Sequence, residues 1–223
     1  ANDNVAVGYQ AFRRGTGSYN TAVGPYAGEG VSGQSDGTYN TFIGHTAGFA
    51  FTSGAFNTFV GSKAGAGLTT GSSNVGIGYT ALNATITGDK NIGVGEYSGA
   101  LLTDGDHNIF MGRSAGYGTT IGNRNIAIGN QAYDASDTES DNLAIGYEAL
   151  TTNLAGGEYN VAIGNYAGKV MTGTGADNNT LVGYNSGVAV TSGGHNTALG
   201  SYSYWRATDG TYNLVAGYNS GGG

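Results

Sequence analysis

Thirteen copies of one short pattern run through the sequence, and no other feature restricts the possible folds as strongly. Each copy begins at an asparagine, has a glycine four residues later, and has alanine or serine three residues after that glycine. Successive asparagines are 16 to 20 residues apart, and most spacings are 17. Such a period is typical of a solenoid, in which equivalent units stack and each contacts only its neighbours. The asparagines are Asn4, Asn20, Asn40, Asn57, Asn74, Asn91, Asn108, Asn125, Asn142, Asn160, Asn179, Asn196 and Asn213.

The residues between asparagine and glycine predict a short β-strand. The first is Thr, Val, Ile or Leu, and the third is Val, Ile, Leu or Met in every copy but the last, which has Ala216. β-Branched residues at alternate positions indicate a strand of four or five residues with that face buried. The intervening residue should point the other way, and its apolar character indicates that this second face is partly covered. We therefore expect an all-β fold: a parallel β-solenoid, or β-roll, of about 13 rungs with a period of about 17 residues and no helix.

The invariant glycine predicts a corner, where φ is positive or another backbone lies too close for a Cβ. The alanine or serine three residues later suits a narrow inward position on a second short strand. Stacked rungs also place equivalent side chains about 4.8 Å apart, at the strand spacing. The thirteen asparagines are therefore expected to form a structural ladder in which side-chain amides bond to one another and to turn backbone groups.

Composition agrees with one repetitive body. Of 223 residues, 44 are Gly and 1 is Pro, and only 10% are charged, against roughly 25% in ordinary globular proteins. We expect residues 1–223 to form a single repeat solenoid. The sequence begins and ends close to repeat boundaries without a distinct cap, which favours a fragment of a longer fibre.

Charge and hydropathy argue against nucleic acid as a partner and against a membrane span in this segment. The net charge is −7 and the eight Lys and Arg residues are scattered, so no basic stripe predicts nucleic-acid binding. No apolar run reaches the length of a membrane span, and the chain has no Cys. Each repeat carries only a few large apolar side chains to oppose the entropy of ordering about 17 residues, which favours an oligomer that shares its apolar faces.

The repeats resemble a known family. Val161-Ala162-Ile163-Gly164-Asn165-Tyr166-Ala167 and Leu143-Ala144-Ile145-Gly146-Tyr147-Glu148-Ala149 are similar to the YadA-like head repeats of trimeric autotransporter adhesins, which also occur in bacteriophage tail fibres. The resemblance covers essentially the whole chain and implies a left-handed parallel β-roll wound as a homotrimer. Asn directly precedes the first apolar residue and the period is longer than in adhesin heads, which favours a phage or other extracellular fibre. The family's motif residues are structural, so the resemblance implies no binding residue.

Motifs that carry chemistry have simpler interpretations here. Gly112-Arg113-Ser114-Ala115-Gly116 matches the Gly-x-Ser-x-Gly pattern of serine hydrolases, but it is the ordinary repeat with Ser at a variable position. His45, His107 and His195 do not fall on adjacent rungs, and the acidic residues form loose, solvated turns. We therefore expect no catalytic residue, no metal site and no cofactor, and we do not expect an enzyme.

The sixteen tyrosines are the best candidates for a contact surface. Five directly follow the corner glycine, four follow one residue later, and four precede the asparagine. Adjacent strand positions face opposite ways, so the first two groups cannot both be buried in one strand. The densest aromatic group is Tyr202, Tyr204 and Trp205, which we name as the possible surface contact.

The function expected from these observations is attachment. The chain should form a rigid segment of an extracellular, cell-surface or virion fibre, with itself as partner in a homotrimer and a host-surface receptor or glycan as a possible ligand. The alternative is a monomeric ice-binding β-solenoid, which needs a regular Thr row. Thr follows the asparagine only at Thr21, Thr41, Thr58, Thr180 and Thr197. A fibre that cleaves glycans would need paired carboxylates in a groove.

Overall fold

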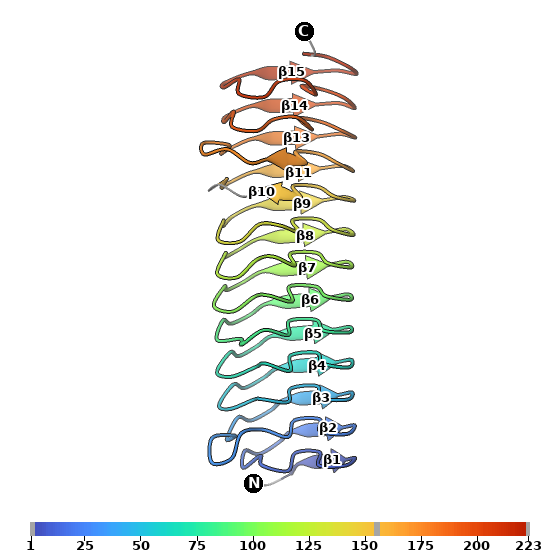
Figure 1. Ribbon diagram of the computed structural model, residues 1–223, viewed down its shortest axis with the longest axis vertical. Coiled ribbons are helices and arrows are strands. Elements are labelled where there is room, and N and C mark those ends of the chain that lie inside the picture. Colours follow the sequence, from blue (N-terminus) through green and yellow to red (C-terminus); the bar gives the residue numbers. More distant parts are fainter. Residues whose placement is uncertain (1–2, 154–156, 222–223) are drawn as a thin grey trace. The chain divides into compact units, whose positions relative to one another are not determined.

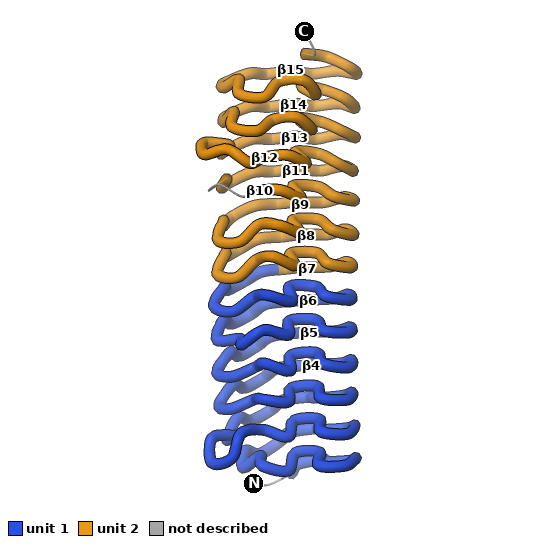
Figure 2. The backbone as a smooth tube through the Cα atoms, in the orientation of Figure 1, with its two compact units in different colours: residues 1–108 blue, residues 109–223 orange. Residues whose placement is uncertain are grey.

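The computed structural model describes residues 3–153 and 157–221, and the chain divides into two compact units, residues 1–108 and 109–223 (Figure 2). Among the described residues, unit 1 contains six strands and unit 2 contains nine. The strands of unit 1 are β1 (Val5–Val7), β2 (Thr21–Val23), β3 (Thr41–Ile43), β4 (Thr58–Val60), β5 (Val75–Ile77) and β6 (Ile92–Val94). Those of unit 2 are β7 (Ile109–Met111), β8 (Ile126–Ile128), β9 (Leu143–Ile145), β10 (Thr152–Asn153), β11 (Val161–Ile163), β12 (Val170–Met171), β13 (Thr180–Val182), β14 (Thr197–Leu199) and β15 (Leu214–Ala216).

Each unit is a parallel β-solenoid, as the repeat predicts. Every rung contributes one strand to the main stack, and the rest of the rung loops back to begin the next strand (Figure 1). Strand β3 pairs in parallel with β4 so that Thr41, Phe42 and Ile43 lie opposite Thr58, Phe59 and Val60. Unit 2 repeats this arrangement and adds a separate parallel pair, β10 with β12. The predicted period is therefore confirmed: residues about 17 positions apart in the sequence lie opposite each other on neighbouring strands.

No helix is found in the described part of the chain, and so none there that could cross a membrane. The strands have three residues at most, which is shorter than the four or five expected. The corner glycine ends each one: Gly44 has a φ of 133°, and a Cβ there would lie 2.5 Å from the carbonyl oxygen of Gly61 on the next rung. Three residues on, Ala47 is buried as predicted, but it lies in a turn and not on a second strand.

The strand prediction was wrong about which face is buried. The central residue of the strand points into the rung, and its side chain is inaccessible in Ala22, Phe42 and Leu181. The β-branched residues on either side point outward, and Ile43 and Ile77 are 38% and 41% exposed. Successive strand residues point to opposite faces, so the central residue and its two neighbours cannot all point into the rung.

The interior accommodates one bulky residue from either of two positions. In four rungs the strand centre is large and the residue six positions later is glycine: Phe42 with Gly48, Phe59 with Gly65, Phe110 with Gly116, and Leu181 with Gly187. In four others the centre is small and the later residue is large: Gly76 with Leu82, Ala127 with Tyr133, Ala144 with Leu150, and Ala198 with Tyr204. A Cβ at Gly65 would lie 2.5 Å from the Phe59 ring. In these eight rungs size is therefore compensated within the rung, whereas Ala22 with Gly28, Gly93 with Gly99 and Ala162 with Gly168 are small at both positions.

Candidate interaction surfaces

The asparagine ladder is present in both units and is internal. The side-chain oxygen of Asn57 accepts a hydrogen bond from the backbone N–H of Asn74 at 2.9 Å, and the Asn57 amide donates to the carbonyl of Gly71 at 2.9 Å. The two groups that it reaches lie 17 and 14 residues further along the chain, about one turn of the solenoid away. Direct amide-to-amide bonds also occur, as from Asn57 to Asn40 at 3.0 Å. The predicted ladder is confirmed, with its most regular bond made to backbone N–H and not to another side chain.

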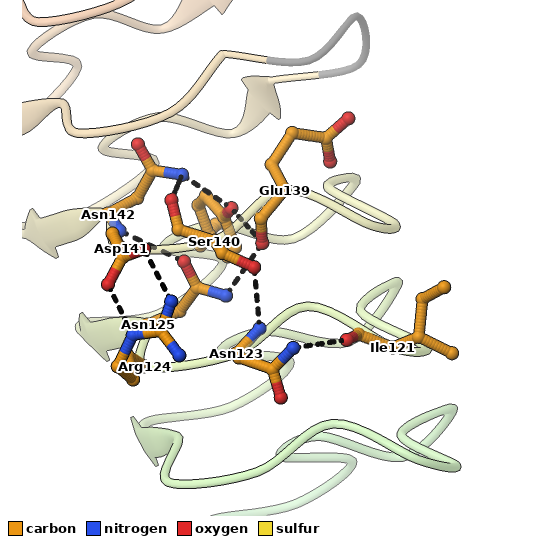
Figure 3. A network of polar contacts seen from close by, with 9 residues as sticks. Ile121, Asn123, Arg124, Asn125, Glu139, Ser140, Asp141 and Asn142 are labelled. Carbon is orange, nitrogen blue, oxygen red and sulfur yellow. Dashed lines mark hydrogen bonds and ion pairs between the residues drawn. The ribbon is translucent and has the colours of Figure 1, made fainter.

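Figure 3 shows one step of this ladder in unit 2. The amide of Asn125 donates to the carbonyl of Glu139 at 2.8 Å, and its oxygen accepts from the backbone N–H of Asn142 at 3.0 Å. Beside it, Arg124 and Asp141 form a two-pronged ion pair at 2.6 and 2.7 Å. Because Asn125 and Asn142 are buried and fully engaged, the ladder holds rungs together and offers nothing to a ligand.

The outward residues of the strands form an exposed, largely apolar feature in each unit. We call the first and third residues of β1–β6 in unit 1, and of β7, β8, β9, β11 and β13–β15 in unit 2, the strand face. None of these positions carries a charge, and each holds Thr, Val, Ile, Leu, Met or Ala. In unit 2, Met111, Ile128 and Leu199 are 41%, 38% and 42% exposed. Large exposed apolar surfaces are unusual in soluble monomers and in general often coincide with interaction sites.

An aromatic stack borders the strand face in unit 1. Tyr19, Tyr39 and Phe56 each precede a ladder asparagine and are more than half exposed. Their rings are parallel, with centroids 4.8 Å apart between Tyr19 and Tyr39 and 5.1 Å apart between Tyr39 and Phe56. All three adopt a positive φ near 60°, which is uncommon for bulky residues. Register alone aligns these rings, because each lies one rung from the next.

A second aromatic arrangement lies at the corner that follows the strands of unit 2. We call Tyr147, Tyr166, Tyr184, Tyr202 and Tyr218 the aromatic corner. They lie on five successive rungs, after β9, β11, β13, β14 and β15, and neighbouring rings meet edge to face. The centroid distances along the series are 5.3, 6.0, 5.3 and 6.3 Å. Tyrosines from both positions after the corner glycine meet here, and Tyr184 and Tyr218 remain 43% and 78% exposed.

The predicted contact group of three aromatic residues is divided by the structure. Tyr202 is half-buried in the aromatic corner, and Trp205 lies beside it with ring centroids 6.3 Å apart. The guanidinium of Arg206 lies 4.3 Å from the centroid of the Trp205 ring. Tyr204 points inward with 6% exposure, and its hydroxyl accepts a hydrogen bond from Asn213. The prediction was wrong for Tyr204, because it is the large residue that fills the rung of Ala198.

Charged groups near the aromatic corner are few and mostly paired. Lys169 donates to Glu148 at 2.6 Å and lies 4.9 Å from the Tyr166 ring. This Lys169 bond, with a bond from Tyr147, lowers the pKa of Glu148. Bonding to Glu148 in turn raises the pKa of the Tyr147 hydroxyl, which therefore stays neutral at physiological pH. At this corner Tyr147 thus presents a neutral phenol beside a carboxylate that is held by a cation.

These surfaces are built mainly from apolar and aromatic side chains. In residues 3–153 and 157–221, no group of three or more His, Cys, Asp or Glu side chains could hold a metal ion. Ser114, at the centre of the Gly-x-Ser-x-Gly match, lies in a turn with a φ of 55°. Comparisons with protein-family models, curated proteins and solved structures find no match for the chain.

Proposed function

We propose that the chain is a rigid structural and attachment segment of an extracellular or virion fibre, in which three copies associate through their strand faces. The observation that carries this proposal is the outward position of the β-branched residues. Val, Ile and Thr side chains repeat along each unit without a single charge, although the rung interior does not need them. Repetition of apolar side chains outside the core is explained if a second surface covers them.

Another copy of the same chain is the partner that fits this surface. The strand face has no charge pattern that would select an unlike protein, and its columns repeat at the strand spacing. A parallel copy presents columns with the same spacing, so side chains can interdigitate along the stack. Three copies around one axis would bury one strand face each and leave the loops outside. The resemblance to trimeric adhesin heads and phage fibres supports the same arrangement.

Sedimentation velocity at micromolar concentration tests the association. The wild-type chain should sediment as a particle of three 22.4 kDa chains. Ile128→Glu, at the third position of β8, should give monomers, because it would bury an unpaired charge between the copies. The matched control is Ile121→Glu, which changes an exposed loop residue of the same unit in the same way and should leave the trimer intact. A wild-type monomer, or equal effects of both changes, contradicts the proposal.

A second function is favoured by one feature of unit 1. Thr21, Thr41 and Thr58 occupy the first strand position on three successive rungs, paired in register and facing outward. A flat, regular Thr array of this kind is what an ice-binding monomer would use. The two functions differ in oligomeric state, so thermal hysteresis and sedimentation measured on the wild-type chain separate them. Hysteresis in a wild-type monomer, lost in Thr41→Lys, would establish ice binding and displace the fibre proposal.

A further inference from the structure

We infer that the aromatic corner of unit 2 is a binding surface for an extended polysaccharide chain. This inference rests on the proposed attachment role and names the ligand class and the residues that contact it. The surface consists of Tyr147, Tyr166, Tyr184, Tyr202 and Tyr218, with Trp205 at one side. It lies after the ends of the strands, on residues that do not belong to the strand face.

The fold does not require tyrosine at these positions. In the same unit, the rung of β7 has Arg113 and Ser114 at the two positions after its corner glycine, and the rung of β8 has Asn130 and Gln131. These rungs pair in parallel and in register like the others. The corner backbone therefore forms equally well with polar side chains. Aromatic residues on the next five rungs are an addition to the fold.

Backbone conformation strengthens this point. Tyr166 and Tyr202 occupy the second position after the corner glycine with φ values of 61° and 56°. Asn185 and Asn219 occupy the same position on other rungs with φ values of 55° and 53°. Asparagine tolerates this left-handed region better than a bulky residue does. Tyrosine is therefore present here against the local conformational preference, and edge-to-face contacts between rings recover part of that cost.

The chemistry of the surface fits a polysaccharide. Partly exposed phenol rings offer apolar area for the C–H faces of sugars together with a hydroxyl for hydrogen bonding, at little cost in side-chain entropy. The exposed amides of Asn165 and Asn219 lie at the same corner, directly before Tyr166 and directly after Tyr218. The Asn165 oxygen accepts from the backbone N–H of Tyr147 at 3.0 Å, which leaves its amide N–H groups for sugar hydroxyls. Because each of these five rungs carries one tyrosine, the aromatic corner offers several weak, similar contacts in a line, which suits a polymer of repeated units.

A single-stranded nucleic acid also stacks on aromatic rings, but it needs a positively charged groove. This corner offers Arg206 over Trp205 and Lys169 paired with Glu148, in a chain of net charge −7. Such a surface does not neutralise a phosphate backbone. A neutral or weakly acidic glycan carries no such requirement, and Arg206 is placed to contact a carboxylate-bearing sugar.

Native gels containing hydroxyethyl cellulose, a neutral polymer, or alginate, an acidic one, test the inference by retardation. The wild-type chain should be retarded by at least one polymer, and the pair of gels shows whether sugar carboxylates are needed. The affinity of the double variant Tyr184→Asn with Tyr202→Asn should be lower than that of the wild type by about tenfold or more. Its fold should persist, because asparagine occupies both positions on other rungs, as Asn130 and Asn185. Circular dichroism verifies this.

Tyr159→Asn is the matched control, since it removes an exposed tyrosine of unit 2 that precedes a ladder asparagine. It should bind like the wild type. The single variant Tyr184→Asn keeps the contacts of Tyr202 with Trp205 and Tyr218. It should also bind more weakly than the wild type, and it changes the corner less than the double variant does. Migration unaffected by both polymers, or equal retardation of the double variant and wild type, overturns the inference. Retardation does not depend on oligomeric state, so a retarded monomer would refute only the trimer, and an unretarded trimer only the polysaccharide site.

Discussion

At the scale of single residues, each ladder asparagine satisfies two backbone groups that would otherwise be buried without a partner. Asn74 is inaccessible; its oxygen accepts the N–H of Asn91 at 2.8 Å and its amide donates to the carbonyl of Gly88 at 2.9 Å. The sequence predicts this role because a short amide side chain, present at thirteen equivalent positions, offers a donor and an acceptor on separate atoms. The backbone partners were harder to predict, because they depend on how closely the loop of the next rung approaches.

Asn74→Ala should lower the free energy of unfolding by roughly 2–5 kcal/mol, since it leaves the Asn91 N–H and the Gly88 carbonyl buried and unpaired. Urea unfolding followed by circular dichroism measures the change. Asn130→Ala removes an exposed asparagine outside the ladder and should change stability by less than about 0.5 kcal/mol. Equal losses in the two variants would show that the ladder adds no stability.

Asp134 is a residue whose ionised form is destabilised in the folded state. One of its carboxylate oxygens is buried without a hydrogen-bond partner, and desolvation raises the pKa of the group. A folded-state pKa above the unfolded value means that ionisation costs stability as the pH rises through the folded-state pKa. Asp134→Asn should therefore be more stable than the wild type at pH 7, by less than about 1 kcal/mol because the side chain is half-exposed. The difference should vanish below the ordinary carboxyl pKa of 3.8. Thermal unfolding at pH 7 and pH 3 checks both statements.

Asp141 should behave in the opposite way. Its hydrogen bonds with Arg124 lower its pKa, so the stabilisation is present above the ordinary carboxyl pKa and is lost as the pH falls through the folded-state value. Asp141→Asn should be slightly less stable than the wild type at pH 7 and equal to it in strong acid. The same pH series on both variants separates desolvation from ion pairing. A shared sign at pH 7 would contradict one of the two assignments.

At the scale of the rung, the sequence predicts the strand and the corner but not which side of the strand is inside. The alternation of apolar residues is symmetrical in this respect, because both faces of β3 and β8 are apolar. The answer lies in a correlation across six residues: bulky centres such as Phe59 are paired with a later glycine, and small centres such as Ala144 with a later large residue. Only a position inside a closed rung needs such compensation. The same correlation would have shown that Tyr204 is internal.

Exchanging the two arrangements tests this packing rule. Phe59→Ala should cost about 3–5 kcal/mol through the cavity it creates. Gly65→Leu should cost about 1–3 kcal/mol or more, because its side chain would overlap the Phe59 ring. The double variant reproduces the pair Ala144 and Leu150 and should recover at least half of the summed loss. A double-mutant cycle by urea unfolding measures the coupling. Simple additivity of the two losses would refute compensation.

At the scale of the whole chain, the sequence repeat predicts the fold well but says little about the ligand. Period, parallel pairing and the ladder follow from what every rung shares, such as Asn57 and Gly61. Surface function depends on what a few rungs have alone, such as Tyr184 and Tyr202. These residues occupy variable positions, where one sequence does not distinguish a ring needed for packing from one needed for binding.

Removal of one rung provides the sharpest test of repetition itself. Deleting residues 58–74 joins Asn57 to Val75 and should leave a folded, cooperatively unfolding protein. In the intact chain Phe59 lies beside Gly76. After the deletion Phe42 would lie beside Gly76 in its stead, so a phenylalanine again packs against this glycine. Stability and the denaturant m-value should both fall, because less surface is buried.

Deleting the single residue Val60 is the informative comparison. It would move Gly61 into an outward strand position and shift the corner against the neighbouring rungs, with which β4 pairs in register. The loss of one residue should therefore be more destabilising than the loss of seventeen. Urea unfolding of both deletions decides the matter. If the 17-residue deletion proves the less stable, rungs are not interchangeable units, and the long-range contacts of each are specific to its own place in the chain.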